Sequence, residues 1–163
     1  MAGKWSKAHL NGYLAGVFDG EGSITCHTHG LTHNPNPGWT MVRASVFMTD
    51  RGPLTLFAAR FPGGSISSRH RNPAYKVAYT WCIRGKKARE VLEFVSRFCI
   101  VKSHQATLAL RVIDLLFDQG SKDSWQGISP ENIQERLAIA RKVSELKKIP
   151  VDDALGHLND LDG

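Results

Sequence analysis

The chain has 163 residues, a length that suits one compact domain with a full hydrophobic core. Hydrophobic residues make up 42% of it, which argues against wholesale disorder, and no apolar run approaches the roughly 18 residues that a membrane-spanning helix needs. Three widely spaced cysteines without a CxxC pair argue against a disulfide framework and a zinc finger, and no secretory signal is recognisable. We therefore expect a soluble intracellular protein, in a cytoplasm or nucleoid or in an organelle matrix, with no membrane partner.

The first half of the chain alternates between helical and strand patterns. Apolar spacing over Lys7 to Phe18 predicts a helix that stops at Gly20 and Gly22. The asparagines and prolines between Gly30 and Gly38 predict a loop. Period-two alternation and short helical spacing predict the other elements, which are strands over Ser23 to His29, Trp39 to Met48, Ser65 to Arg71 and Tyr75 to Ile83, and a helix over Pro53 to Phe61.

The second half of the chain is predicted to be helical. Amphipathic spacing predicts helices over Lys86 to Phe98 and over Ser103 to Phe117. After a polar stretch, Ser129 caps a further helix whose first residue is Pro130. We divide the chain into a core (1–118), a linker (119–128), and a C-terminal helix with an acidic tail (129–163) that belongs to the same domain.

The order of these elements predicts the fold class. Helix, two strands, helix, two strands and then helices (α-β-β-α-β-β-α with additional C-terminal helices) indicate an α+β domain. Its centre is expected to be a four-stranded antiparallel sheet, with helices packed on its apolar face.

Positive charge is concentrated in one part of the chain. Between Gly22 and Arg89 there is one acid, Asp50, against ten Lys or Arg residues, a distribution typical of proteins that bind polyanions. The tail from Val151 carries four aspartates and no Lys or Arg, so we expect it to avoid DNA. Arginines mixed with hydrogen-bonding side chains suit the base edges of a major groove, although an ordinary solvated sheet face is the alternative. Strand alternation assigns these residues to the polar surface: Ser23, Thr25, His27, His29, Arg43, Ser45, Ser67, Arg69, Arg71, Lys76 and Thr80.

One nine-residue stretch carries a specific signal. Leu14-Ala15-Gly16-Val17-Phe18-Asp19-Gly20-Glu21-Gly22, followed at once by an alternating strand, resembles the motif of the LAGLIDADG homing endonucleases of the single-motif, homodimeric type. Met48-Thr49-Asp50-Arg51, Gly63-Gly64-Ser65-Ile66 and Lys102-x-x-Gln105-Ala106 fit later segments of that family. The resemblance covers roughly Lys7 to Phe117.

The resemblance implies a catalytic site at the end of the first helix. In that family the acidic residue at the position of Glu21 binds the catalytic metal, and the carbonyl of Gly20 can assist. This implies Mg²⁺ (or Mn²⁺), which prefers oxygen ligands. The same analogy makes Asp19 structural, places Lys102 near the scissile phosphate, and gives Arg51 a peripheral catalytic role.

The first helix also predicts an interface. Gly12, Ala15 and Gly16 stand at i, i+3 and i+4, so one helix face has almost no side chain and a second helix can approach closely. Because the motif occurs once, we expect that helix to come from a second copy in a twofold homodimer. A helix contact within the chain is the alternative.

The predicted function is site-specific cleavage of double-stranded DNA. Each subunit would read half of a near-palindrome of about 20 bp through the major groove and hydrolyse one phosphodiester per strand. The resemblance implies staggered ends and intron homing. Two alternatives share the fold. The first is a catalytically inactive DNA-binding regulator, which is favoured by Met48 at a position where the family often has a polar residue. The second is a maturase that binds intron RNA.

Overall fold

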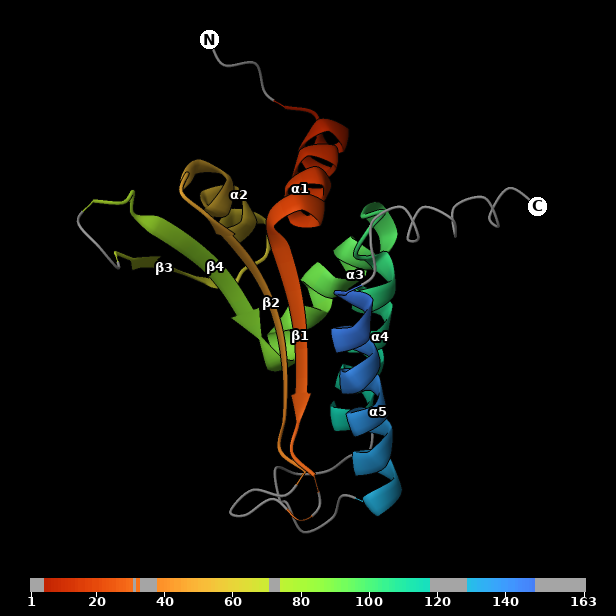
Figure 1. Cartoon of the computed structure of the whole chain (residues 1–163). Helices are drawn as coiled ribbons and strands as arrows, with labels where there is room; N and C mark the ends of the chain where they lie inside the picture. The colour runs from red at the N-terminus through yellow and green to blue at the C-terminus, as the bar shows by residue number, and fades with distance from the viewer. Residues whose placement is uncertain (1–4, 31, 33–37, 71–73, 118–128, 149–163) are drawn as a thin grey trace.

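The computed structural model describes residues 5–30, 32, 38–70, 74–117 and 129–148 of the chain (Figure 1). The predicted α+β class and the predicted order of elements are confirmed. The expected linker and the aspartate-rich tail lie outside the described residues. The elements are α1 (Lys7–Glu21), β1 (Gly22–Thr28), β2 (Thr40–Met48), α2 (Gly52–Arg60), β3 (Ser65–Arg69), β4 (Ala78–Arg84), the 3₁₀ turn η1 (Gly85–Ala88), α3 (Arg89–Phe98), α4 (Ser103–Phe117) and α5 (Pro130–Leu146).

The four strands form one antiparallel sheet in the order β1-β2-β4-β3. Two hairpins, β1–β2 and β3–β4, are joined through their second strands, so β1 and β3 are the edges. In Figure 1 the β1–β2 hairpin runs the length of the molecule while β3 and β4 diverge from it to one side. The predicted four-stranded sheet is therefore confirmed.

Several predicted boundaries were wrong. Helix α1 continues through Gly20 and ends at Glu21, because a glycine weakens a helix by only about 1 kcal/mol and the helix end is held by tertiary contacts. Gly22 ends the helix with an extended backbone, and its N–H donates to the carbonyl of Phe18. The β3–β4 hairpin is shorter than predicted, and the helix predicted from Lys86 starts as a 3₁₀ turn.

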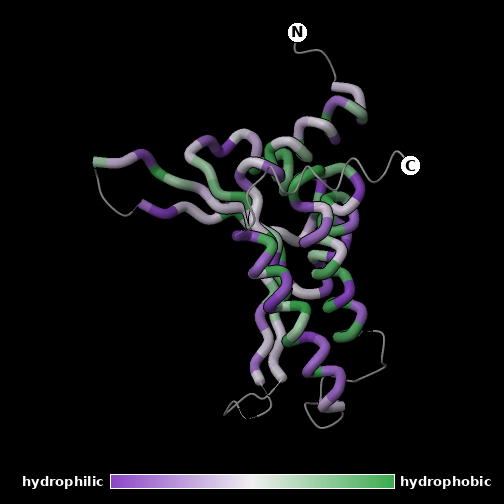
Figure 2. Tube along the Cα trace, turned by 45° about the vertical axis from the view of Figure 1, so that its right-hand side comes forward, coloured by the Kyte–Doolittle hydropathy of each residue, from purple (hydrophilic) through white to green (hydrophobic). Residues whose placement is uncertain are grey.

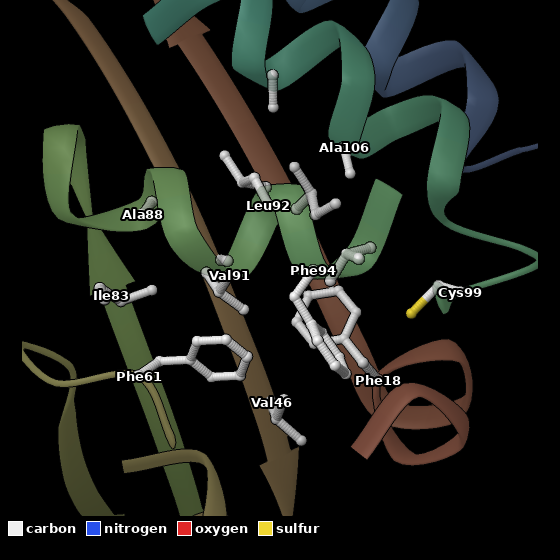
Figure 3. Packing of buried hydrophobic residues seen from close by; sticks show 14 of the residues in the cluster. Phe18, Val46, Phe61, Ile83, Ala88, Val91, Leu92, Phe94, Cys99 and Ala106 are labelled. Atoms are coloured by element: carbon white, nitrogen blue, oxygen red, sulfur yellow. The ribbon is translucent and has the colours of Figure 1, made fainter. Parts of the chain in front are cut away.

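The core lies between the apolar face of the sheet and helices α1 to α4. Trp81 of β4 is fully buried at its centre, and its ring centroid is 5.2 Å from that of Phe57 in α2. Phe61 continues this cluster to Phe94 of α3, at 5.3 Å between ring centroids. Figure 3 shows the α3 side chains facing strand residues such as Val46, and Figure 2 shows apolar segments gathered where the helices meet the sheet.

Helix α5 packs along edge strand β1 and against α4. Its N-cap is Ser129 and its first residue is Pro130, as predicted. The Asn132 amide donates to the carbonyl of Leu115 in α4 at 3.1 Å. Arg136, which is 1% exposed, donates from Nη1 to the Gly38 carbonyl and to Thr40 Oγ1 at the base of the β1–β2 hairpin. Burial lowers the pKa of this guanidinium. None of the described helices is long and apolar enough to cross a membrane.

Candidate active site and nucleic-acid interface

Glu21 is the last residue of α1, and β1 follows it directly. Its side chain is exposed and makes no hydrogen bond or ion pair with any described residue. Gly20 precedes it and is also exposed. The junction between helix and sheet therefore holds an oxygen donor that is free to take a ligand.

Asp19, two positions earlier, has the opposite environment. One of its carboxylate oxygens accepts the N–H of Ile100 at 2.8 Å, and the other accepts the N–H of Lys102 at 3.1 Å. The ammonium of Lys102 in turn donates to the backbone carbonyl of Asp19. These bonds brace the α3–α4 loop against the end of α1, so the Asp19 carboxylate is occupied structurally.

Lys102 is half-buried beside this helix end. Burial lowers the pKa of its ammonium, while the negative charges of Asp19 and Glu21 partly oppose that shift. Burial also raises the pKa of Cys99 to about 12, so the neighbouring thiol is neutral near pH 7. The structure thus brings Lys102, Asp19 and Glu21 into one electrostatic cluster that joins residues 81 positions apart.

Two further residues that the resemblance singled out lie at the end of β2 and just after it, at the end of the sheet where Gly22 of β1 pairs with Val46. Arg51 is exposed at the N-terminus of α2 and makes no hydrogen bond or ion pair with Glu21 or Lys102. Met48, at the end of β2, packs against the core and pairs with Tyr79 of β4. Its thioether is directed by strand alternation to the apolar side of the sheet.

The strand register places most of the predicted polar residues on one face. Ser23 stands opposite Ser45, and Thr25 stands opposite Arg43 on the neighbouring strand. Alternation and pairing add further predicted residues to this surface, namely His27, Ser67, Arg69 and Thr80. It also carries Met41 and Phe47, which the alternation of the second predicted strand places beside Arg43 and Ser45. Sequence reasoning missed Ser65, Cys82 and Arg84, although the same alternation, extended by one residue in β4, could have identified them. No strand position on this face holds a carboxylate.

The other predicted contacts lie off the strands. His29 follows β1, and its ring stacks near His27 and Trp39, with centroid distances of 5.2 and 5.0 Å. Lys76 is exposed before β4, and Arg71 lies outside the described residues. Within the described part of the chain, no three His, Cys, Asp or Glu side chains gather as a metal-binding group.

A lysine from α5 reaches the polar face. Lys147 Nζ lies 3.4 Å from both Ser23 Oγ and Thr25 Oγ1, more than 120 residues away in sequence. Burial lowers the pKa of Lys147, and the nearby cation of Arg43 also lowers it. No local sequence signal could have placed this lysine, because its position depends on how α5 packs along β1.

The predicted small-residue face of α1 is partly open. Gly12 and Gly16 are exposed, and a Cβ added to either would meet nothing within 4 Å. Gly20 continues this open line at the same spacing. Ala15, in contrast, is 6% exposed and lies in the core, and its carbonyl accepts from Cys99 Sγ. The open face of α1 therefore consists of the three glycines.

This arrangement is the fold of the LAGLIDADG homing endonucleases, and the resemblance read from the motif is confirmed at the level of fold. The archaeal intron-encoded I-Vdi141I, solved in complex with DNA, superposes with a TM-score of 0.70 at 14% identity, covering 96% of this chain and 99% of that one. I-CvuI, in complex with its target in the presence of 2 mM Ca, gives 0.65 at 23% identity, covering 91% and 94%. I-TnaI gives 0.62 at 17% identity, covering 85% and 93%.

Another homing endonuclease of this fold is much longer than this chain. I-SmaMI, bound to uncleaveable DNA, matches with a TM-score of 0.62 at 13% identity over 80% of this chain but 43% of its own. No family model and no curated protein matches the sequence. This chain thus corresponds in size to the shorter proteins of this fold.

Proposed function

We propose that the protein is a site-specific, metal-dependent DNA endonuclease that acts as a homodimer. The observation that carries this proposal is the free carboxylate of Glu21, which stands where α1 joins a polar sheet face without carboxylates. Lys102 is fixed beside it through Asp19. The solved DNA complexes of the same fold support nucleic acid as the partner.

The sheet face supports recognition of double-stranded DNA. Arginines, serines and threonines alternate on it, and together they offer charged donors and adaptable hydroxyls. Side chains of these types pair with base edges and phosphates in the major groove. A β-surface that supplied lysines alone would favour phosphate contact without base discrimination.

The open glycine line of α1 supports the proposed dimer. Gly12, Gly16 and Gly20 leave backbone exposed over two turns, and a second helix could approach it more closely than the usual ~8–10 Å. Two copies related by a twofold axis would place two Glu21 carboxylates near that axis. Each sheet would then read one half of a near-palindromic target.

The donors at the helix end fit a hard divalent cation. Glu21 and the backbone carbonyl of Gly20 are oxygen ligands, and Mg²⁺ is commonly held by one or two carboxylates together with water and substrate phosphates. Bound there, the metal would supply Lewis-acid activation of a phosphodiester and of a water molecule. I-CvuI with a DNA target was also solved in the presence of 2 mM Mg, in which the DNA was not cleaved.

The residues of the chain have distinct roles in this proposal. Glu21, together with the Gly20 carbonyl, would hold the cation. Lys102 places its ammonium group near the phosphate, where this positive charge stabilises the negative charge that develops on the phosphate oxygens. Asp19 acts as a positioning residue, because it fixes the backbone of Lys102. Arg51 keeps the peripheral catalytic role that the resemblance gives it.

Cleavage of a randomised near-palindromic DNA library with Mg²⁺ tests the proposal. The wild-type protein is compared with Glu21→Gln and with Glu93→Gln, a matched control at an exposed position of α3. We expect defined cuts from the wild type and the control, and none from Glu21→Gln. Specific binding without cutting by any of the three would instead identify a catalytically inactive DNA-binding protein.

A further inference from the structure

A hollow lies where β4 ends and η1 begins, away from the Glu21 cluster. Its volume is about 520 Å³. It is lined by Gly63, Ser65, Cys82, Ile83, Arg84, Lys86 and Lys87. Three of these residues, Ser65, Cys82 and Arg84, belong to the polar sheet face, so the hollow is continuous with the proposed DNA surface.

The lining is cationic and lacks counter-charges. Arg84, Lys86 and Lys87 make no ion pair with a carboxylate of the described residues, although four other basic residues of the chain do. Arg43 is the direct cross-strand partner of Arg84 on the same face. Like charges directly opposite each other destabilise a sheet. An anion bound between or beside Arg43 and Arg84 would therefore reduce the repulsion between their guanidinium groups.

Contacts with neighbouring residues position both lysines of the hollow. Gly63 has φ +98°, and a Cβ there would stand 3.0 Å from Cδ of Lys87, so the stem of Lys87 lies over the bare glycine. The ammonium of Lys86 lies 5.8 Å from the ring centroid of Phe117, within cation–π range. Packing against Gly63 and Phe117 thus holds the side chains of Lys87 and Lys86 beside the hollow.

We propose that this hollow binds a backbone phosphate of the DNA beside the polar sheet face, at the end of β4. All three charged residues of the lining, Arg84, Lys86 and Lys87, are cations. Its side chains offer guanidinium and ammonium donors and one hydroxyl, all of which match phosphate oxygens. The inference rests on the proposed function, because the phosphate belongs to the bound duplex.

The salt dependence of binding tests this site. Affinity for a mixed-sequence duplex is measured in Mg²⁺-free buffer over a range of salt concentrations, for wild type, for Lys87→Gln and for Arg84→Gln/Lys87→Gln. Arg97→Gln, at an exposed position of α3, is the charge-matched control. A variant that no longer binds this phosphate should have a slope of log K against log salt that is shallower by about 1 per subunit. The control slope should equal that of the wild type.

A second measurement needs no variant. Acetylation of lysines in the wild-type protein is quantified by mass spectrometry with and without the duplex. Lys87 should be protected, while Lys7, at the far end of α1 from Glu21, should not. Unchanged slopes in both variants, or equal acetylation of Lys87 with and without DNA, would overturn the phosphate site while leaving DNA binding intact. A wild type that binds no duplex would remove the proposed function, and this site with it.

Discussion

Asp19 and Glu21 lie two positions apart on α1, yet their surroundings divide their roles. Asp19 accepts two backbone N–H groups of the α3–α4 loop, whereas Glu21 is exposed and bonded to no described residue. The motif alone suggested this division by analogy. It could not identify the loop that Asp19 braces, because Ile100 and Lys102 are 81 and 83 positions away and carry no local sign of the contact.

Replacing Asp19 by alanine should lower both stability and activity. The N–H groups of Ile100 and Lys102 would lose a charged acceptor, and hydrogen bonds to charged groups contribute about 1.5–3 kcal/mol in favourable sites. We expect an unfolding free energy lower by roughly 1–3 kcal/mol in urea titrations. Asp50→Ala is the control, since Asp50 bonds one N–H, that of Gly52, in an exposed turn. Equal stability of the two variants would contradict the bracing role.

The pH profile of cleavage should report Lys102. Because burial lowers its pKa, the ammonium loses its proton at a lower pH than an exposed lysine would. Activity that depends on the cation therefore declines as pH rises through this lowered value. The arginine of Lys102→Arg keeps its charge over the whole pH range of the assay. The cleavage activity of this variant should therefore begin to fall at a higher pH than that of the wild type, even if its maximal rate is lower. Identical alkaline limbs for wild type and variant would show that the charge of Lys102 is not used.

At the scale of the element, α1 serves both the core and an open surface. Leu14 and Phe18 are fully buried, while Gly12 and Gly16 face solvent in the subunit. Sequence spacing predicted the helix and its small-residue face, but it included Ala15 in that face. Ala15 instead belongs to the core, and its carbonyl accepts a hydrogen bond from Cys99 Sγ of the segment after α3.

Gly16→Ala and Gly22→Ala should have contrasting effects. A Cβ at Gly16 meets nothing in the subunit and improves helix propensity by up to about 1 kcal/mol, but it would separate two closely packed helices. We expect the Gly16→Ala chain to fold but to form a weaker dimer. In sedimentation velocity over a concentration series, this dimer should dissociate at a higher protein concentration than the wild type does. A Cβ at Gly22 would stand 2.4 Å from the carbonyl oxygen of Phe18, so that variant should lose folding stability instead. A Gly16→Ala protein that associates as wild type would argue against α1 as the interface.

At the scale of the whole molecule, the fold was predictable and its long-range contacts were not. The spacing of apolar residues and the positions of turn-forming residues indicate the order of the elements. Strand alternation places Thr25 and Arg43 on one face. The strand order β1-β2-β4-β3 and the docking of α5 depend on packing between distant segments. For that reason Lys147, which reaches the polar face from α5, and the hollow at the end of β4 could not be found from sequence.

A mixed dimer tests whether two subunits each use Glu21 to cut one strand of the DNA. Wild-type and Glu21→Gln chains with different affinity tags are co-expressed, and the heterodimer is isolated and incubated with Mg²⁺ and a supercoiled plasmid bearing a selected target. We expect linear plasmid from the wild-type dimer, intact plasmid from the dimer in which both chains carry Glu21→Gln, and nicked circles from the heterodimer. Linear product from the heterodimer, or cleavage by the Glu21→Gln dimer, would contradict it.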